Sequence, residues 1–260
     1  MDRARSHDLD NNETLLTSPE EVKTEAINVF SNQFRKRNHK FDELLPSHWE
    51  EEYSPKEDID PDIFKLNCPL TLQEWMDVVK NSSNKSAAGN SGIGYQMIKH
   101  ASKKVHEILT QLANLCFTAQ IVPTQWKLTS LFPIPKPKDW DYNIANTRLI
   151  LLIKCVQKLT VKMLNNRLSH IFSIHNVLKG PNYAGLKGSS TAIPIHTICN
   201  IMEDAREKNK ELWIAAQDMA KAFDSVGLTP LKRALLRIKV PAHTINFIID
   251  LFEQIGRAHV

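Results

Sequence analysis

Apolar residues recur at helical spacing in several parts of the chain, and helix-start signals precede them. The run from Ser18 to Glu21 places a serine cap, a first-turn proline and glutamates in the order that begins a helix. It predicts a helix to about Arg37, with one apolar face formed by Val22, Ala26, Val29, Phe30 and Phe34. The run from Thr71 to Glu74 repeats the capping pattern and predicts a short helix through Val79.

The rest of the chain is patterned mainly as helices with few strands. Further helices are predicted over residues 92–119 (as one helix or two), 154–173, 191–208, 228–238 and 242–255. Two short apolar runs, residues 128–134 and 212–216, predict strands. The second run ends just before Asp218, which fits a central strand of a sheet. Long helices with few strands predict an α+β fold.

Other stretches carry neither periodicity. Residues 1–17 are polar and charged, and they are predicted to fray. Residues 38–68 are acidic and proline-rich and predict an extended linker, because proline lacks the N–H that a helix interior needs. Loops are predicted over residues 85–93 and 180–190. These patterns divide the chain into an acidic N-terminal arm and linker, residues 1–69, and a body, residues 70–260.

Charge changes this picture, because the net charge of +4 over 260 residues is unevenly distributed. Residues 1–75 hold 17 acidic and 9 basic side chains, whereas the remainder holds 12 acidic and 24 basic ones. A basic body attracts a polyanion such as nucleic acid through its phosphates. An ordinary solvated basic face explains the charge about equally well.

The cysteines and the apolar runs bear on the compartment. Cys68, Cys116, Cys155 and Cys199 stand apart from one another, so neither a zinc ribbon nor a disulfide framework is expected. They are predicted to be small buried residues of a reducing compartment. No apolar run approaches the roughly 20 residues that cross a bilayer. We therefore expect a soluble intracellular protein, nuclear or cytoplasmic, without membrane contact.

The sharpest chemical signal is the apolar run that ends at Asp218. A carboxylate at the end of a strand lies at a sheet edge, where hard cations can bind between it and phosphate oxygens. The simpler reading is an aspartate that caps the next turn, and spacing alone favours that reading.

Several sequence motifs favour metal binding by Asp218 over the role of a turn cap. The run from Asp218 to Val226, Asp-Met-Ala-Lys-Ala-Phe-Asp-Ser-Val, resembles the first palm motif of reverse transcriptases of non-LTR retrotransposons. Further matches to the family follow in the right order upstream, over residues 85–93, 122–137, 146–152, 154–168 and 183–191. The sequence departs from the family's usual residues at Ala88, Leu149, Tyr183, Leu186 and Ser189.

The resemblance assigns roles to residues at the palm motif. It implies that Asp218 is the catalytic carboxylate that binds Mg²⁺. Phe223 inherits the place beneath the incoming sugar, where an aromatic ring rejects a 2′-hydroxyl, and Asp224 is expected to be structural. The implied partners are an RNA template, a DNA primer and deoxynucleoside triphosphates. The implied fold is the fingers and part of the palm of a right-hand polymerase, with the acidic helical arm beside it.

Other residues are candidates for phosphate or template contact. Arg148 and Lys136 are the candidate triphosphate cations, because a guanidinium or ammonium group can reach the phosphates. A solvated turn lysine is about as probable for Lys136, whereas the functional reading leads for Arg148. Gly185 and Gly188 fit a loop that lets a template backbone pass closely, or an ordinary turn. Four basic residues of one predicted helix are additional candidates for contact with template phosphates, although a solvated helix face is the stronger interpretation for each: Lys154, Lys158, Lys162 and Arg167. Three aromatic residues are candidates for base stacking, although core or rim packing is the stronger interpretation for each: Trp126, Trp140 and Tyr142.

The family's second carboxylate motif, an aromatic-Ala-Asp-Asp hairpin, does not occur in the 260 residues. We therefore expect an incomplete and inactive fragment of an RNA-directed DNA polymerase, which lacks that motif and the thumb. The alternatives are a non-catalytic remnant that still binds nucleic acid, and a relic that neither folds stably nor binds.

Overall fold

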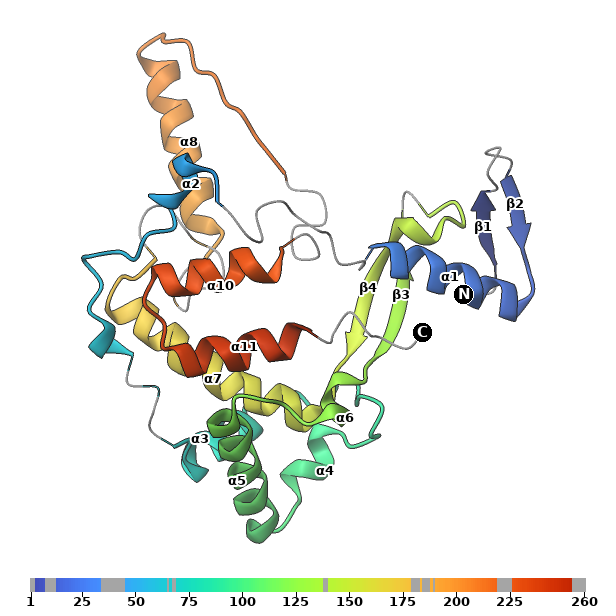
Figure 1. Cartoon of the computed structure of the whole chain (residues 1–260). Coiled ribbons are helices and arrows are strands. Elements are labelled where there is room, and N and C mark those ends of the chain that lie inside the picture. The colour runs from blue at the N-terminus through green and yellow to red at the C-terminus, as the bar shows by residue number, and fades with distance from the viewer. Residues whose placement is uncertain are drawn as a thin grey trace.

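The structure is a computed structural model that describes residues 3–7, 13–33, 45–64, 66, 69–137, 140–178, 183, 188, 190–218 and 226–253. Helices dominate these residues, together with two antiparallel two-stranded sheets (Figure 1). The elements are β1 (Ala4–His7), β2 (Glu13–Leu16), α1 (Pro19–Gln33), α2 (Ser47–Glu50), η2 (Pro61–Ile63), α3 (Leu72–Lys80), α4 (Tyr95–Lys99), α5 (Lys103–Ala119), α6 (Thr124–Lys127), β3 (Ser130–Pro135), η3 (Ile144–Asn146), β4 (Thr147–Leu152), α7 (Cys155–Ile174), α8 (Ala192–Glu207), α10 (Leu228–Arg237) and α11 (Ala242–Glu253). The mixture of helix and sheet agrees with the predicted α+β class.

Helix α7 lies at the centre of the helical body (Figure 1), and its first half packs against α3 and α5. Leu159 and Met163 of α7 are fully buried there against Trp75 of α3. The predicted capping box of α3 is present, because Thr71 Oγ1 accepts from the Glu74 N–H and Glu74 Oε2 accepts from the Thr71 N–H. The pattern therefore predicted the start of this helix, which ends at Lys80, one residue beyond the predicted Val79.

A second cluster joins α7 to α5, α6 and α11. Phe117, Trp126, Leu164 and Phe247 are buried in it, which confirms the packing role expected of Trp126. A partly buried ion pair reinforces the junction, with Lys127 Nζ 2.8 Å from Asp250 Oδ1. Helix α11 is thereby joined to a segment more than a hundred residues earlier in the chain.

The hairpin of β3 and β4 projects from the helical body, and α1 lies beside it (Figure 1). The strands pair antiparallel with Ser130 opposite Leu152 and Pro135 opposite Thr147. One face of the hairpin packs against the predicted apolar stripe of α1, through Ala4, Val22, Ala26, Phe30, Leu131 and Ile144. Strand β3 was predicted, whereas β4 was read only as a motif and missed as a strand.

Two predictions on the N-terminal half need correction. Residues 1–17 were expected to fray, but β1 and β2 form a hairpin with Ala4 fully buried. Residues 38–68 were expected to be an extended linker, but Ile59, Phe64 and Leu66 are buried against α7, α10 and α11. Four-residue strands and isolated apolar residues leave no periodic signal, because their partners are distant in sequence. The uncertain helical region 92–119 divides into α4 and α5.

Two further predictions concern α8 and the segment after it. The predicted helix α8 is present, but none of its residues is buried, and Cys199 is exposed rather than a core residue. The run 212–216 is not a strand, and Trp213 is 90% exposed. In the described part of the chain no strand lies alongside this run, so its backbone lacks the ladder partners that a strand requires.

Candidate functional site

The outer face of the β3–β4 hairpin is the surface that collects the predicted fingers residues. Successive side chains of a strand point to opposite faces, so Phe132 and Ile134 point away from α1 when Leu131 points toward it. Phe132 pairs with Ile150 and Ile134 pairs with Arg148, and these four side chains are exposed. We call this set, Phe132, Ile134, Arg148 and Ile150, the outer face.

Lys136 extends this face by one residue pair. Its N–H donates to the carbonyl of Asn146 at 3.2 Å, so the strand pairing continues beyond Pro135. By the alternation of side chains, Lys136 then lies on the same side as Ile134 and Arg148. Neither cation has a hydrogen bond or ion pair within the described part of the chain. The fold therefore brings the two predicted triphosphate cations together and leaves both free to bind an anion.

The loop of residues 85–93 packs against the base of the hairpin. A Cβ added at Gly89 would lie 2.7 Å from the Lys154 nitrogen and 2.9 Å from the Ile153 oxygen. Asn90 also hydrogen-bonds to Ser130 of β3. Because both neighbours of Gly89 are main-chain atoms, only glycine fits without a shift. Sequence reasoning identified this loop as a motif but did not predict this contact.

Two of the basic residues proposed for template phosphates have structural partners instead. Arg167 forms a two-pronged contact with Glu74, at 2.7 Å from Nε to Oε1 and 2.8 Å from Nη2 to Oε2. Chiefly through these bonds, Arg167 lowers the pKa of Glu74 to about 2. Lys154 Nζ donates to the carbonyls of Gln125 and Leu128, and burial lowers the pKa of this lysine. Lys162 is exposed, and Lys158 lies 3.5 Å from the Ala87 carbonyl.

The residues predicted for the palm lie partly outside the described part of the chain. Asp218 is exposed at the end of an irregular segment, and no described contact joins it to Arg148 or Lys136. Gly188 has a φ of +89°, which favours glycine. Phe223, Asp224 and Gly185 lie outside the described residues. Among the residues that are described, no group of three or more His, Cys, Asp or Glu side chains is placed to hold a metal ion, and no helix is long and apolar enough to span a bilayer.

Sequence reasoning missed a clamp at the tip of the hairpin. Asp141 and Tyr142 have positive φ values of 33° and 55°, which non-glycine residues rarely adopt. Arg5 of β1 holds this turn, because its Nη1 lies 2.9 Å from Asp141 Oδ2 and its N–H donates to the Tyr142 carbonyl at 2.7 Å. The rings of Trp140 and Tyr142 lie 6.0 Å apart beside it. No local sequence pattern near Arg5 predicts a contact with a loop so distant in sequence.

Comparison with known proteins finds two similar retrotransposon proteins. The chain is similar to RNA-directed DNA polymerases of retrotransposons, which confirms the resemblance seen in the motifs. It is 29% identical over 180 residues to the "Retrovirus-related Pol polyprotein from type-1 retrotransposable element R2" of Popillia japonica. It is 23% identical over 158 residues to the "Probable RNA-directed DNA polymerase from transposon BS" of Drosophila melanogaster.

The extent of these matches is partial. They cover 69% and 61% of this chain but only 24% and 17% of the two relatives. The chain thus matches less than a quarter of the length of either protein. No protein-family model matches the chain.

Proposed function

We propose that this chain is a segment of a retrotransposon RNA-directed DNA polymerase, with the β3–β4 hairpin as part of its fingers and α7 leading toward its palm. The observation that carries the proposal is the position of two cations, Arg148 and Lys136, on the outer side of the hairpin, where neither side chain has a partner among the described residues. The partial similarity to two retrotransposon polymerases supports it.

The outer face can hold a nucleotide by two physical means. The guanidinium of Arg148 offers a planar fork of donors that matches phosphate oxygens, and Lys136 adds a point charge beside it. The exposed apolar side chains of Phe132, Ile134 and Ile150 provide a surface that the base of a nucleotide or template can cover. An RNA template, a DNA primer and a deoxynucleoside triphosphate are the proposed partners.

The palm contributes Asp218 as a proposed carboxylate ligand for Mg²⁺, with Phe223 five residues later. In nucleotidyl transfer, two such ions stabilise the attacking and leaving oxygens. A single carboxylate is a weak host for two divalent ions, and the aromatic-Ala-Asp-Asp motif that would supply further carboxylates does not occur in the 260 residues. We therefore propose that the 260-residue chain binds nucleotide and nucleic acid but does not extend a primer.

The test is binding of an RNA–DNA hybrid and of a labelled triphosphate, measured by fluorescence anisotropy at increasing salt. We expect Arg148→Met to weaken triphosphate binding about tenfold or more, because a charge-assisted contact is lost. Lys103→Met is the matched control, since Lys103 is exposed on α5 in a weak pair with Glu107. An equal loss of triphosphate affinity in both variants, or no loss of affinity in either, would contradict the assignment of Arg148.

The same assay separates polymerase ancestry from plain nucleic-acid binding. Binding of the hybrid that weakens with salt, with no selective effect of Arg148→Met on triphosphate, would favour the non-catalytic alternative. Primer extension in the presence of Mg²⁺ would show instead that the chain supplies a complete site.

A further inference from the structure

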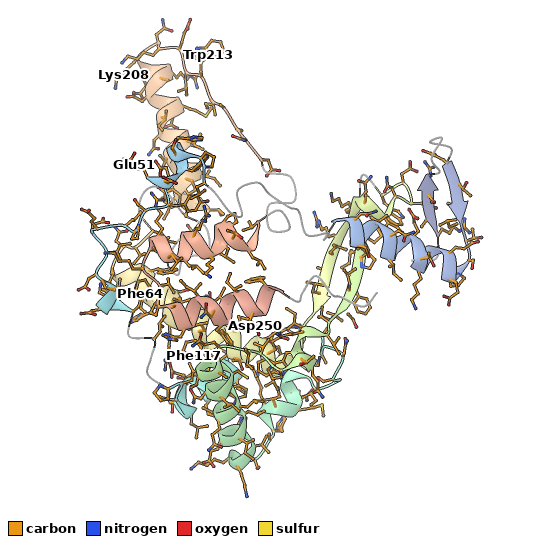
Figure 2. The ribbon with its side chains drawn as sticks, viewed as in Figure 1. Glu51, Phe64, Phe117, Lys208, Trp213 and Asp250 are labelled. Atoms are coloured by element: carbon orange, nitrogen blue, oxygen red, sulfur yellow. The ribbon has the colours of Figure 1, made fainter. Side chains whose placement is uncertain are left out.

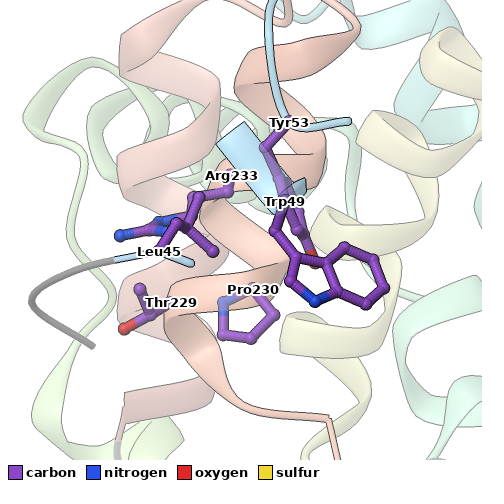
Figure 3. Close-up of a pocket in the computed structure, with 6 residues that line it drawn as sticks. All are labelled: Leu45, Trp49, Tyr53, Thr229, Pro230 and Arg233. Atoms are coloured by element: carbon purple, nitrogen blue, oxygen red, sulfur yellow. The ribbon is translucent and has the colours of Figure 1, made fainter. Parts of the chain in front are cut away.

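A small cavity lies between the segment around α2 and the first turns of α10 (Figure 3). Its volume is about 210 Å³, and it is lined by Leu45, Trp49, Tyr53, Thr229, Pro230 and Arg233. Cavities for drug-sized ligands span roughly 300–1,000 Å³. This one therefore suits a single ring-sized group of a larger partner.

Contacts outside the cavity hold its two walls together. Arg237 of α10 lies 3.2 Å from Glu52, from Nη2 to Oε2, and its carbonyl accepts from the Lys56 N–H at 2.9 Å. The cavity is thus bounded by a tied pair of segments. Trp49 is 46% exposed although its ring lies 6.3 Å from that of Tyr53, so a broad aromatic surface is available at this site.

Arg233 gives the site its chemical preference. Its Nη1 is buried, and no hydrogen-bond partner for it lies among the residues that the structure describes. A buried donor without a partner is destabilising, and an incoming acceptor would remove that penalty. The charge of Arg233 disfavours cationic ligands such as an ammonium group. The exposed carboxylates of Glu50, the last residue of α2, and of Glu51, which follows it, disfavour an anionic group inside the cavity.

A neutral planar ring with acceptors on its edge satisfies these conditions. The aromatic side chains of phenylalanine and tryptophan are of a size that fits the cavity, but their rings carry no hydrogen-bond acceptor at the edge. A nucleobase has both, and guanine presents O6 and N7, the acceptors that arginine contacts most often. In Figure 3, Trp49 lies on one side of the lining residues and Arg233 and Thr229 lie on the other, with Pro230 between Thr229 and Trp49. One end can stack against a ring while the other meets its edge.

We propose that this cavity binds an unstacked base of single-stranded nucleic acid, with guanine preferred. The inference rests on the proposed function in so far as that function brings single-stranded RNA to the chain. The cavity is distinct from the outer face of the hairpin, which belongs to other elements.

The experiment measures binding of two labelled nonamer RNAs, one of nine uridines and one with a central guanosine. We expect the guanosine to tighten binding about tenfold, a preference within the range of a single arginine–base contact. Trp49→Ala and Arg233→Met should each abolish this preference. The matched controls are Trp213→Ala, at an exposed tryptophan, and Lys232→Met, at the exposed residue beside Arg233; both should retain it.

A thermal-shift series with free guanosine and with N-acetyltryptophanamide gives a second readout. Guanosine should raise the Tm of the wild-type chain but not of the folded Trp49→Ala variant, and the tryptophan amide should raise it less. Equal binding of both RNAs, or equal stabilisation by both small molecules, would overturn the proposal and leave the proposed function standing. Stabilisation by guanosine without binding of either RNA would support the cavity and count against the proposed function. No response to guanosine or to RNA would overturn both.

Discussion

At the scale of single residues, the most informative contacts join motifs that are far apart in sequence. Glu74 closes the capping box of α3 and also holds Arg167 of α7. The side chains of this pair are 34% and 17% exposed, so solvent screens it in part. One carboxylate therefore begins a helix and fixes its packing partner.

Glu74→Gln should remove a pH-dependent part of the stability. The pKa of Glu74 falls from 4.5 to about 2 on folding, so its contribution is full above pH 4.5 and is lost as the pH falls toward 2. After allowance for solvent screening, we expect a loss on the order of 1 kcal/mol at pH 7. Denaturant unfolding at several pH values measures it, with the exposed Glu107→Gln as control. A constant difference between wild type and variant down to pH 2 would contradict this assignment.

Gly89→Ala should destabilise the folded chain, because the added methyl group would lie too close to main-chain atoms of neighbouring residues. The new Cβ would lie 2.7 Å from the Lys154 nitrogen and 2.8 Å from the Ile153 carbonyl carbon. Such overpacking costs about 1–3 kcal/mol. Gly94→Ala is the control, because nothing lies within 4 Å of a Cβ there. Equal midpoints of urea unfolding for the two variants would show that the loop moves freely.

At the scale of elements, long-range ties decide how the helices dock. Helix α11 was predicted from its own apolar pattern, but its position depends on Asp250. That carboxylate accepts from the Val122 N–H at 2.8 Å and pairs with Lys127. The side chains of Lys127 and Asp250 are only 11% and 16% exposed, so the pair is shielded from water.

Asp250→Ala should loosen α11 from the segment that precedes β3. Removal of one partner of a shielded pair leaves an ammonium group and an amide without acceptors, at a cost of about 3 kcal/mol. The double variant Lys127→Met with Asp250→Leu should lose less stability than Asp250→Ala, because no charge remains buried. Thermal unfolding of the three proteins measures this, and equal losses would mean that packing alone holds the helix.

At the scale of the whole molecule, apolar surface is unevenly distributed. Helix α8 rises from the helical body (Figure 1), and Figure 2 shows Lys208 at its far end near Trp213. Its exposed apolar side chains are Ile193, Ile195, Ile198, Ile201 and Met202, and Leu212, Trp213 and Ile214 follow. Monomeric proteins rarely leave so much apolar surface uncovered.

We therefore expect the isolated chain to self-associate as its concentration rises. Replacing Ile198 and Ile201 with lysine should shift the association to at least tenfold higher concentration, since charge on this surface opposes contact. Val105→Lys on α5, also exposed, is a control outside this surface. Sedimentation velocity over a concentration series measures the effect. A wild-type chain that remains monomeric at high concentration would contradict the expectation.

Local signals determined much of this protein. The capping residues and the periodic stripes predicted α1, α3, α7, α8, α10 and α11, and ordered motifs predicted the similarity to retrotransposon polymerases, which the comparisons confirm. These features could be read because helix periodicity and caps depend on residues within a few positions of one another.

Tertiary structure decided the features whose partners are distant. The buried places of Ala4 and Leu66, the pairing of β4 with β3 and the clamp of Arg5 on Asp141 all join residues far apart in sequence. The run 212–216 has strand-like composition but no neighbouring strand, so it remained irregular. Arg148 and Lys136 were chosen from the sequence by charge and resemblance, yet only the register of the hairpin puts them on one exposed face, because pairing determines which side chains are neighbours.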